Sequence, residues 1–509
     1  MRAVVVALIA AAVVGVCIRW GSFVAGGSDS YCYLYQAERW ADAIKHPFGG
    51  RLQVVEPLAN EAPWPDAAAT FAPVGHAPSP TVTGAVVPIC PPGLSLAMAP
   101  FILVAGRDGA FAILPLFGAL LILATYLVGA RFGGKVGVAA ALIAAVSPIV
   151  LYQAVQPMSD VPAAALWMLA VALASSTGRH HAILSGLATS AAILVRPNLL
   201  PLGFAIGVFL LARPERTTRQ RFRAAIQYAA GSSLGCIAIA TINSVFYGSP
   251  FASGYGSFDT LFSANHVGPN VRSYLDWLWT THTPAIALAI LAPLLLPGAL
   301  TALFVSLFVL NLALYLPYTR FEDWSFLRFL LPTIPLVLVL VVAATDTIVR
   351  RWIRLADTKL VLTVVSIGLA LLFVREARDR QVFRLHRMES RFERAGRFVG
   401  ERLPSNAVVF TTWHSGSVRF YGDRKTVVWD VLDPAWLDRS VEYLRSRGYD
   451  PYFLFEGQEE QRFRERFRGG LLGALDWPPM TDIVGQVRIY NPEDEKRYRI
   501  GSIRTEYVR

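Results

Sequence analysis

The sequence predicts a polytopic α-helical membrane protein with a small C-terminal α/β domain outside the membrane. Of the 509 residues, 54% are hydrophobic and only 16% are charged, and the mean hydropathy is +0.44. This composition is typical of chains with many membrane spans and excludes an ordinary soluble protein of this length. The apolar blocks stop near residue 374, so we expect a transmembrane domain over residues 1–374 and a separate domain over residues 375–509.

The formal net charge of +11 does not indicate a nucleic-acid partner. No basic run is interleaved with stacking aromatic residues, as a nucleic-acid interface requires. The arginines cluster between apolar blocks instead, which is typical of cytoplasmic loops in membrane proteins. We therefore predict that the chain binds no nucleic acid.

The first apolar block, residues 3–18, follows a single basic residue, Arg2. A cleaved signal peptide is the alternative interpretation, but its basic region is weak and further apolar blocks follow. The proline-rich stretch over residues 21–109 breaks any long helix. We therefore predict an uncleaved first span with the N-terminus inside, followed by a long first external loop over residues 21–109.

The apolar segment 88–106 within this loop decides the topology. If it only dips into the membrane or lies on it, the connectors richest in arginine all fall on the cytoplasmic side; counting it as a span would place them outside. We therefore predict about eleven spans and an external C-terminal region, although several runs are shorter than the ~20 residues of an untilted span. The predicted spans are residues 3–18, 110–130, 136–156, 161–176, 182–195, 197–212, 224–247, 284–297, 298–318, 328–348 and 359–374.

Residues 375–509 show strands alternating with helices, which favours a small α/β layer. Within it, Trp413, His414 and Trp429 are candidates to line a sugar site, with buried core residues as the alternative. The expected helices are residues 392–403, 434–447 and 458–467, and the expected strands are residues 407–412, 426–429, 451–455 and 485–490.

Cysteine usage is sparse. Cys17 and Cys236 lie in predicted spans, whereas Cys32 and Cys90 share the first external loop. One disulfide there is compatible with an oxidising periplasm, and two cysteines that never meet are the alternative. The absence of a CxxC motif and the dispersed histidines argue against a dedicated zinc site, so we predict no metal ligands.

Asp29 is the first candidate catalytic residue, in the stretch GSDSYCYLYQAERW over residues 27–40. It lies where the first span emerges on the outer face, and a carboxylate at such a boundary can take a proton from a hydroxyl group. The alternative is a solvated loop carboxylate or a helix cap, because Ser28 and Asp29 precede a helical pattern.

Three further charged residues are predicted on the outer face. Asp160, in SDVP, begins a helix, and a carboxylate at such a start is fixed in place whether or not it caps the helix. Arg196 and Arg328 lie at membrane depth, where a basic group usually has a partner; an anionic lipid headgroup is one candidate. Snorkelling of both side chains to the interface is the alternative.

Together these motifs resemble the GT-C superfamily of membrane glycosyltransferases, and within it the bacterial protein O-mannosyltransferases and lipid A aminoarabinose transferases. The resemblance rests on the carboxylate after the first span, the PPG-led apolar segment from residue 91, the SDVP helix start, the RPN at residues 196–198 and DWSFLRFLLP at residues 323–332. Their order along the chain makes the match specific.

The resemblance implies an enzyme of the inner membrane that moves a hexose or pentose from a polyprenyl-phosphate donor to a lipid, glycan or protein acceptor. Asp29 would be the general base and Asp160 the second acidic residue, and Arg196 and Arg328 would bind the lipid phosphate. A divalent cation is left open. Many family members carry an Asp–Glu pair in the first loop, whereas Ser28 and Ser30 flank Asp29 here. The rival interpretations are a lipid or glycan flippase and a structural assembly protein.

Overall fold

The computed structural model describes residues 1–47, 52–352, 358–483, 485–498 and 505–508. These residues form two compact units. The helical unit comprises Met1–Gly21, Pro91–Ile242 and Gly256–His386, and the mixed unit comprises Ser22–Cys90, Asn243–Tyr255 and Arg387–Arg509. Residues 22–90 of the predicted first external loop therefore belong to the same compact unit as most of the predicted C-terminal domain.

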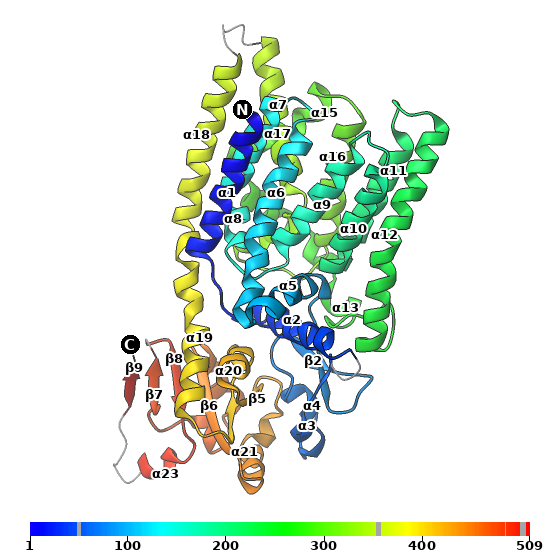
Figure 1. The fold of residues 1–509 in the computed structure, drawn as a ribbon. Coiled ribbons are helices and arrows are strands. Elements are labelled where there is room, and N and C mark those ends of the chain that lie inside the picture. Colours follow the sequence, from blue (N-terminus) through cyan, green and yellow to red (C-terminus); the bar gives the residue numbers. More distant parts are fainter. Residues whose placement is uncertain (48–51, 353–357, 484, 499–504, 509) are drawn as a thin grey trace. The chain divides into compact units, whose positions relative to one another are not determined.

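The helical unit is built from apolar helices (Figure 1). Its helices are α1 (Arg2–Trp20), α5 (Pro92–Ala105), α6 (Ile113–Gly129), α7 (Gly134–Val146), α8 (Pro148–Ala154), α9 (Asp160–Ala174), α10 (His181–Val195), α11 (Leu200–Ala212), α12 (Thr218–Tyr247), α13 (Phe258–Leu261), α14 (Val267–His282), α15 (Leu288–Leu295), α16 (Ala299–Tyr315), α17 (Ile334–Trp352) and α18 (Thr358–Asp379). Short 3-10 segments are η1 (Arg107–Ala112), η2 (Pro197–Leu199), η3 (Ala264–His266), η4 (Pro284–Ala287), η5 (Trp324–Leu330) and η6 (Val382–Arg384).

Helix α9 is the centre of this unit. It packs against α6 and α10, and every residue except Leu169 and Leu173 is buried. A helix that is apolar on all sides lies inside a bundle. Its alanines, among them Ala163, Ala164 and Ala165, allow the neighbouring helices to approach closely.

Four helices in the described residues are long and apolar enough to cross a membrane, or up to seven if each strongly bent helix pair counts as one span. The bent pairs are Gly134–Val146 with Pro148–Ala154, Ala264–His282 with Pro284–Leu295, and Trp324–Leu330 with Ile334–Arg351. Together with further apolar helices of 10–17 residues, these helices cover at least part of each of the eleven predicted spans. These properties are those of a multi-pass membrane protein, and the total of eleven spans stays a prediction.

Helix α5 occupies the apolar segment that we did not count as a span. It has 14 residues and contains Pro100, so it is shorter than the ~20 residues that an untilted span needs. Figure 1 shows it lying across the end of the bundle rather than along the axis of α6.

The mixed unit contains two sheets. The smaller is antiparallel, in the order β1 (Val54–Val55), β3 (Ala85–Pro88), β2 (His76–Pro78). The larger has the order β5 (Lys425–Val427), β4 (Ala407–Phe410), β6 (Asp450–Glu456), β8 (Val487–Tyr490), β7 (Thr481–Ile483), β9 (Glu506–Val508). Helices of this unit are α2 (Asp29–Lys45), α3 (Pro57–Glu61), α4 (Ala67–Thr70), α20 (Ser415–Gly422), α21 (Leu437–Ser446), α22 (Glu459–Arg466) and α23 (Asp494–Tyr498), with α19 (Leu385–Arg402) entering it, and the 3-10 segments η7 (Pro434–Trp436) and η8 (Leu472–Ala474).

The larger sheet has a hydrophobic core on each face, as the alternation of side chains along a strand requires. Val408 and Phe410 point into one core, and Val409 points into the other. Trp64 and Phe71 of the first loop are part of the Phe410 core. The first loop is therefore an integral layer of this sheet domain.

Each of the four predicted strands overlaps an observed one, but α20, α23, β7 and β9 were not predicted. These elements are only three to eight residues long. Segments of this length carry too few periods for their pattern to stand out.

Gly137 supplies a test of the close packing of α6 on α7. A Cβ atom there would lie 2.7 Å from the carbonyl oxygen of Tyr126 and 2.9 Å from the backbone nitrogen of Ala130. Because backbone atoms have little room to move, Gly137→Ala is expected to destabilise the protein by ~1–3 kcal/mol. Thermal unfolding in detergent should show a lower midpoint. Gly15→Ala is the matched control, since a Cβ at Gly15 meets nothing within 4 Å, and it should leave the midpoint unchanged or slightly raised.

Candidate active site

A buried carboxylate between two arginines lies in the helical unit. Asp160, the first residue of α9, is fully buried. Its Oδ1 accepts from Arg196 Nη2 at 2.6 Å, and its Oδ2 lies 4.0 Å from Arg328 Nη1. The structure thus brings together three of the four residues that the sequence nominated.

The local structure explains how these side chains meet. Ser159 precedes α9 but its side chain makes no capping hydrogen bond; its Oγ accepts from Arg196 Nε at 3.3 Å instead. Arg196 ends α10, because a residue that precedes a proline is disfavoured in the helical conformation. The predicted helix start at Asp160 is therefore confirmed, and the Ser159 side chain serves the ion pair rather than the helix end.

Aromatic side chains enclose the arginines. The Phe329 ring centre lies 5.9 Å from Cζ of Arg196 and 5.4 Å from Cζ of Arg328. Tyr315 stacks on Phe329 at 4.7 Å, and its hydroxyl accepts from Asn198 Nδ2 at 2.7 Å. Such rings attract cations and exclude water, so the ionic contacts act in surroundings of low dielectric constant. The roles of Tyr315 and Phe329 were not predicted, although Asn198 and Phe329 belong to the RPN and DWSFLRFLLP motifs.

Asp29 belongs to the mixed unit, where it is the first residue of α2 and is partly buried. The chain just before it is held by the C-terminal helices. The backbone N–H of Ala25 donates to the Tyr421 hydroxyl at 2.8 Å, and a Cβ on Gly26 would lie 2.6 Å from Phe392 Cδ2. Close packing on residues more than 360 positions away therefore fixes where α2 begins.

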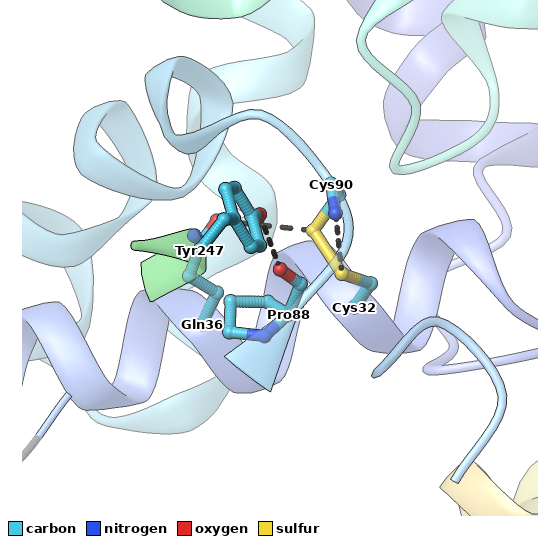
Figure 2. Close-up of a disulfide and its surroundings, with 5 residues drawn as sticks. All are labelled: Cys32, Gln36, Pro88, Cys90 and Tyr247. Carbon is cyan, nitrogen blue, oxygen red and sulfur yellow. Dashed lines mark hydrogen bonds between the residues drawn. A yellow bond between two sulfur atoms is a disulfide. The ribbon is translucent and has the colours of Figure 1, made fainter. Parts of the chain in front are cut away.

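A disulfide ties α2 to the end of the first loop. Cys32 and Cys90 are bonded, with Cα atoms 6.2 Å apart, which settles the alternative that the sequence left open. Figure 2 shows the buried Gln36 beside the bond and the Tyr247 hydroxyl donating to the Pro88 carbonyl at 2.7 Å. Since Cys32 lies one helical turn after Asp29, the disulfide restrains the start of α2.

Two of the three aromatic residues considered for a sugar site are buried: His414 is fully enclosed, and Trp429 packs on Phe463 in the core. The Trp413 side chain is 47% exposed. No group of three or more His, Cys, Asp or Glu side chains among the described residues is placed to hold a metal ion.

The comparisons with known proteins agree with this architecture. Residues 90–244, which include Asp160 and Arg196, match the sequence model of the family described as dolichyl-phosphate-mannose-protein mannosyltransferase. The structure of ArnT from Cupriavidus metallidurans in the apo state is similar with a TM-score of 0.56 and 11% identity, over 90% of this chain and 94% of ArnT. ArnT bound to undecaprenyl phosphate matches to the same extent. The chain has the GT-C fold.

Other GT-C structures support the same conclusion. The apo oligosaccharyltransferase of Archaeoglobus fulgidus matches with a TM-score of 0.55 and 12% identity, over 92% of this chain and 71% of its own. The same organism's oligosaccharyltransferase AglB, in complex with an inhibitory peptide and a dolichol-phosphate, matches with a TM-score of 0.53 and 11% identity, over 94% of this chain and 72% of its own. No curated protein matches the chain. The resemblance to GT-C glycosyltransferases that the sequence motifs indicated is confirmed.

The buried cluster of Asp160, Arg196 and Arg328 predicts which substitutions destabilise the protein most. Asp160→Asn leaves two arginines without their carboxylate, whereas Arg196→Met leaves Asp160 beside Arg328. Removing one partner of a buried pair costs ~3–5 kcal/mol. We expect Asp160→Asn to lower the thermal midpoint in detergent more than Arg196→Met does. The exposed pair of Arg320 and Glu322 provides the control, because Arg320→Met should change stability by less than ~1 kcal/mol. Equal midpoints for Asp160→Asn and wild type would contradict the ranking.

The disulfide closes a loop with a sequence separation of 58 residues. In the chain-entropy model, a crosslink over a loop of this length stabilises the folded state by about 4 kcal/mol. The double change Cys32→Ser with Cys90→Ser should therefore lower the thermal midpoint clearly. Replacement of the free Cys236 by Ser should not. Labelling of Cys32 and Cys90 by a maleimide in the unreduced, denatured protein would show that the bond had not formed.

Proposed function

We propose that the chain is a glycosyltransferase that moves a sugar from a polyprenyl-phosphate donor to an envelope lipid, glycan or protein at the outer face of the inner membrane. The observation that carries the proposal is the buried cluster of Asp160, Arg196 and Arg328 within a GT-C fold. ArnT binds undecaprenyl phosphate and AglB binds a dolichol-phosphate with this fold.

The two arginines suit a lipid phosphate. A guanidinium group presents paired N–H donors that match phosphate oxygens, and its interaction with an anion is strong where water is excluded. Both Arg196 and Arg328 are mostly buried, with side chains 10% and 17% exposed. In our proposal, Asp160 orients the two guanidinium groups, and they stabilise the charge that develops on the departing phosphate.

Asp29 is the proposed general base. Its carboxylate takes the proton from an acceptor hydroxyl while the acceptor oxygen attacks the anomeric carbon of the donor sugar. The bond between that carbon and the phosphate oxygen breaks, its electron pair stays on the polyprenyl phosphate, and the configuration inverts. One carboxylate suffices because a phosphate leaving group needs little protonation, unlike the leaving group of a glycosidase.

This proposal assigns Asp160 a positioning role instead of the catalytic role expected from the sequence. Its Oδ1 and Oδ2 face Arg196 and Arg328, and such contacts with cations disfavour a metal ion at the same oxygens. A divalent cation therefore enters the proposed mechanism at no step.

A lipid or glycan flippase is the alternative function. Three bent helix pairs occur, and broken spans are common in transporters. Transporter sites use such breaks in corresponding positions of two repeated halves. Among the described residues, one bent pair lies before residue 155 and two lie after residue 263, so the pairs are not divided equally between two halves. The glycosyltransferase is therefore favoured.

Replacement of Asp29 tests the mechanism. Asp29→Asn should lower the rate of transfer from a panel of radiolabelled polyprenyl-phosphate sugars to envelope lipids and polymers by ~10²–10⁴-fold, because a general base contributes on this scale. Binding of the donor and the thermal midpoint should stay as in the wild type. Glu38→Gln, on the same helix α2, is the matched control and should retain the wild-type rate.

The same assay separates the remaining possibilities. Transfer that persists in Asp29→Asn would exclude the proposed base while leaving the enzyme class intact. Movement of intact donor across a vesicle membrane without release of sugar would favour the flippase. A chelator should leave the wild-type transfer rate unchanged. Loss of transfer in the presence of the chelator would establish that the enzyme requires a metal ion.

A further inference from the structure

The carboxyl edge of strands β4 and β5 carries polar groups that the fold does not use. Thr411 and Thr412 follow β4, and Trp429 and Asp430 follow β5. Within the described part of the chain, Thr411 Oγ1, Thr412 Oγ1, Trp429 Nε1 and Asp430 Oδ1 are buried and make no hydrogen bond. Thr412 and Trp429 are 8% and 2% exposed. Buried polar atoms are seldom left without a partner, so four at one edge require a partner that the protein itself does not supply.

The topology places the residues that follow β4 beside the point where open α/β sheets bind ligands. Strands β5, β4 and β6 are parallel, and the chain runs from β4 to β5 on one side and then across to β6 on the other. The connections therefore leave β4 in opposite directions, and the switch point lies between β4 and β6. Ligands of such sheets bind outside the carboxyl ends of the strands at this switch point.

The register of β4 and β5 places Thr412 and Trp429 at equivalent positions beyond the paired residues. Phe410 is paired with Val427, and the N–H of Thr411 donates to the Val427 carbonyl at 2.9 Å. Thr412 and Trp429 each come two residues beyond the paired positions, and side chains two residues apart share a face of a sheet. By this alternation Thr412 and Trp429 continue the face that carries Phe410 and Val427, and Trp429 belongs to the same hydrophobic core as these two residues.

Glu459 adds a carboxyl group to this edge. Its Oε1 accepts from the backbone N–H of Trp413 at 3.0 Å, and its Oε2 accepts from that of Glu456 at 2.9 Å. Burial raises the pKa of Glu459 to about 7, and the charges of Glu456 and Asp430 add to the rise. Near neutral pH this carboxyl can donate as well as accept a hydrogen bond.

We propose that this edge binds a carbohydrate. Hydroxyls, an indole N–H and carboxyl oxygens together match a ligand whose every polar group is a hydroxyl, and the 47% exposed Trp413 indole offers a flat apolar surface beside them. Two acidic side chains disfavour a phosphate. A cation is disfavoured because the described residues include no group of three or more metal-ligating side chains.

The edge connects to the start of α2 through packed side chains. Glu456 Oε2 is 2.9 Å from His414 Nε2, and the His414 ring lies 4.7 Å from that of Phe392. Phe392 in turn packs on Gly26, three residues before Asp29. In the proposed function the bound carbohydrate serves as the acceptor; that role rests on the proposed function, whereas the binding itself does not.

Binding is measured by saturation-transfer NMR on the full chain in lipid nanodiscs, without donor, using mannotriose, cellotriose and arabinotriose as probes. At least one probe should bind, and Trp413→Ala and Thr412→Val should each weaken its binding about tenfold, as expected for one lost contact of ~1.4 kcal/mol. Thr481→Val is the matched control. Thr481 is fully buried in β7 of the same sheet and its hydroxyl also makes no hydrogen bond in the described residues, so its replacement should leave the affinity unchanged.

The proposal is overturned if no probe binds to the wild type, or if Trp413→Ala and Thr412→Val bind the probe as tightly as the wild type does. It is also overturned if the wild type binds terbium, measured by luminescence, and Asp430→Asn does not, because the edge would then be a cation site. Asp29→Asn should bind the probe like the wild type. If Asp29→Asn binds the probe and neither the wild type nor any variant transfers sugar, the transferase proposal fails, whereas the proposal of a carbohydrate-binding site is supported. If transfer to non-carbohydrate acceptors proceeds equally well in Trp413→Ala, the acceptor role fails.

Discussion

The architecture of the helical unit depends on one charge, the carboxylate of Asp160. A charge enclosed by apolar helices is stable only when it is paired and hydrogen-bonded. Arg196 and Arg328 supply this pairing from the end of α10 and from η5, more than 130 positions apart in the sequence. The ends of three helical segments are therefore held at one point, and their geometry there is determined by ionic contacts more than by the non-directional packing of alanines.

The pairing with Asp160 also determines what the two arginines can bind. A carboxylate placed between two arginines orders their side chains before any substrate arrives, so the entropy of ordering them is already lost on folding. The ring of Phe329 beside both cations limits the access of water. Two ordered guanidinium groups favour an anionic group with several oxygens, which is the chemical basis of the proposal that they bind a polyprenyl phosphate.

Much of the helical unit could be predicted from the sequence, because long apolar blocks and the SDVP and RPN motifs are local signals. The sequence also indicated that Arg196 and Arg328 need partners at membrane depth, but it could not show that Asp160 is shared between them. The place of the first loop was beyond local patterns too. Phe71 packs in one core with Phe410 and Val427, and contacts between residues so far apart leave no periodic trace.

The position of Asp29 depends on residues from three distant parts of the chain. The disulfide to Cys90 holds α2 at its first turn, Tyr421 and Phe392 hold the preceding residues, and a Cβ on Gly416 would lie 2.4 Å from the Tyr31 ring. Because α19 and α20 also pack on the larger sheet, a change in that sheet can reach Asp29 without a change in α2 itself. In the proposed mechanism the base is therefore positioned by residues of the mixed unit, whereas the arginines that bind the donor phosphate belong to the helical unit.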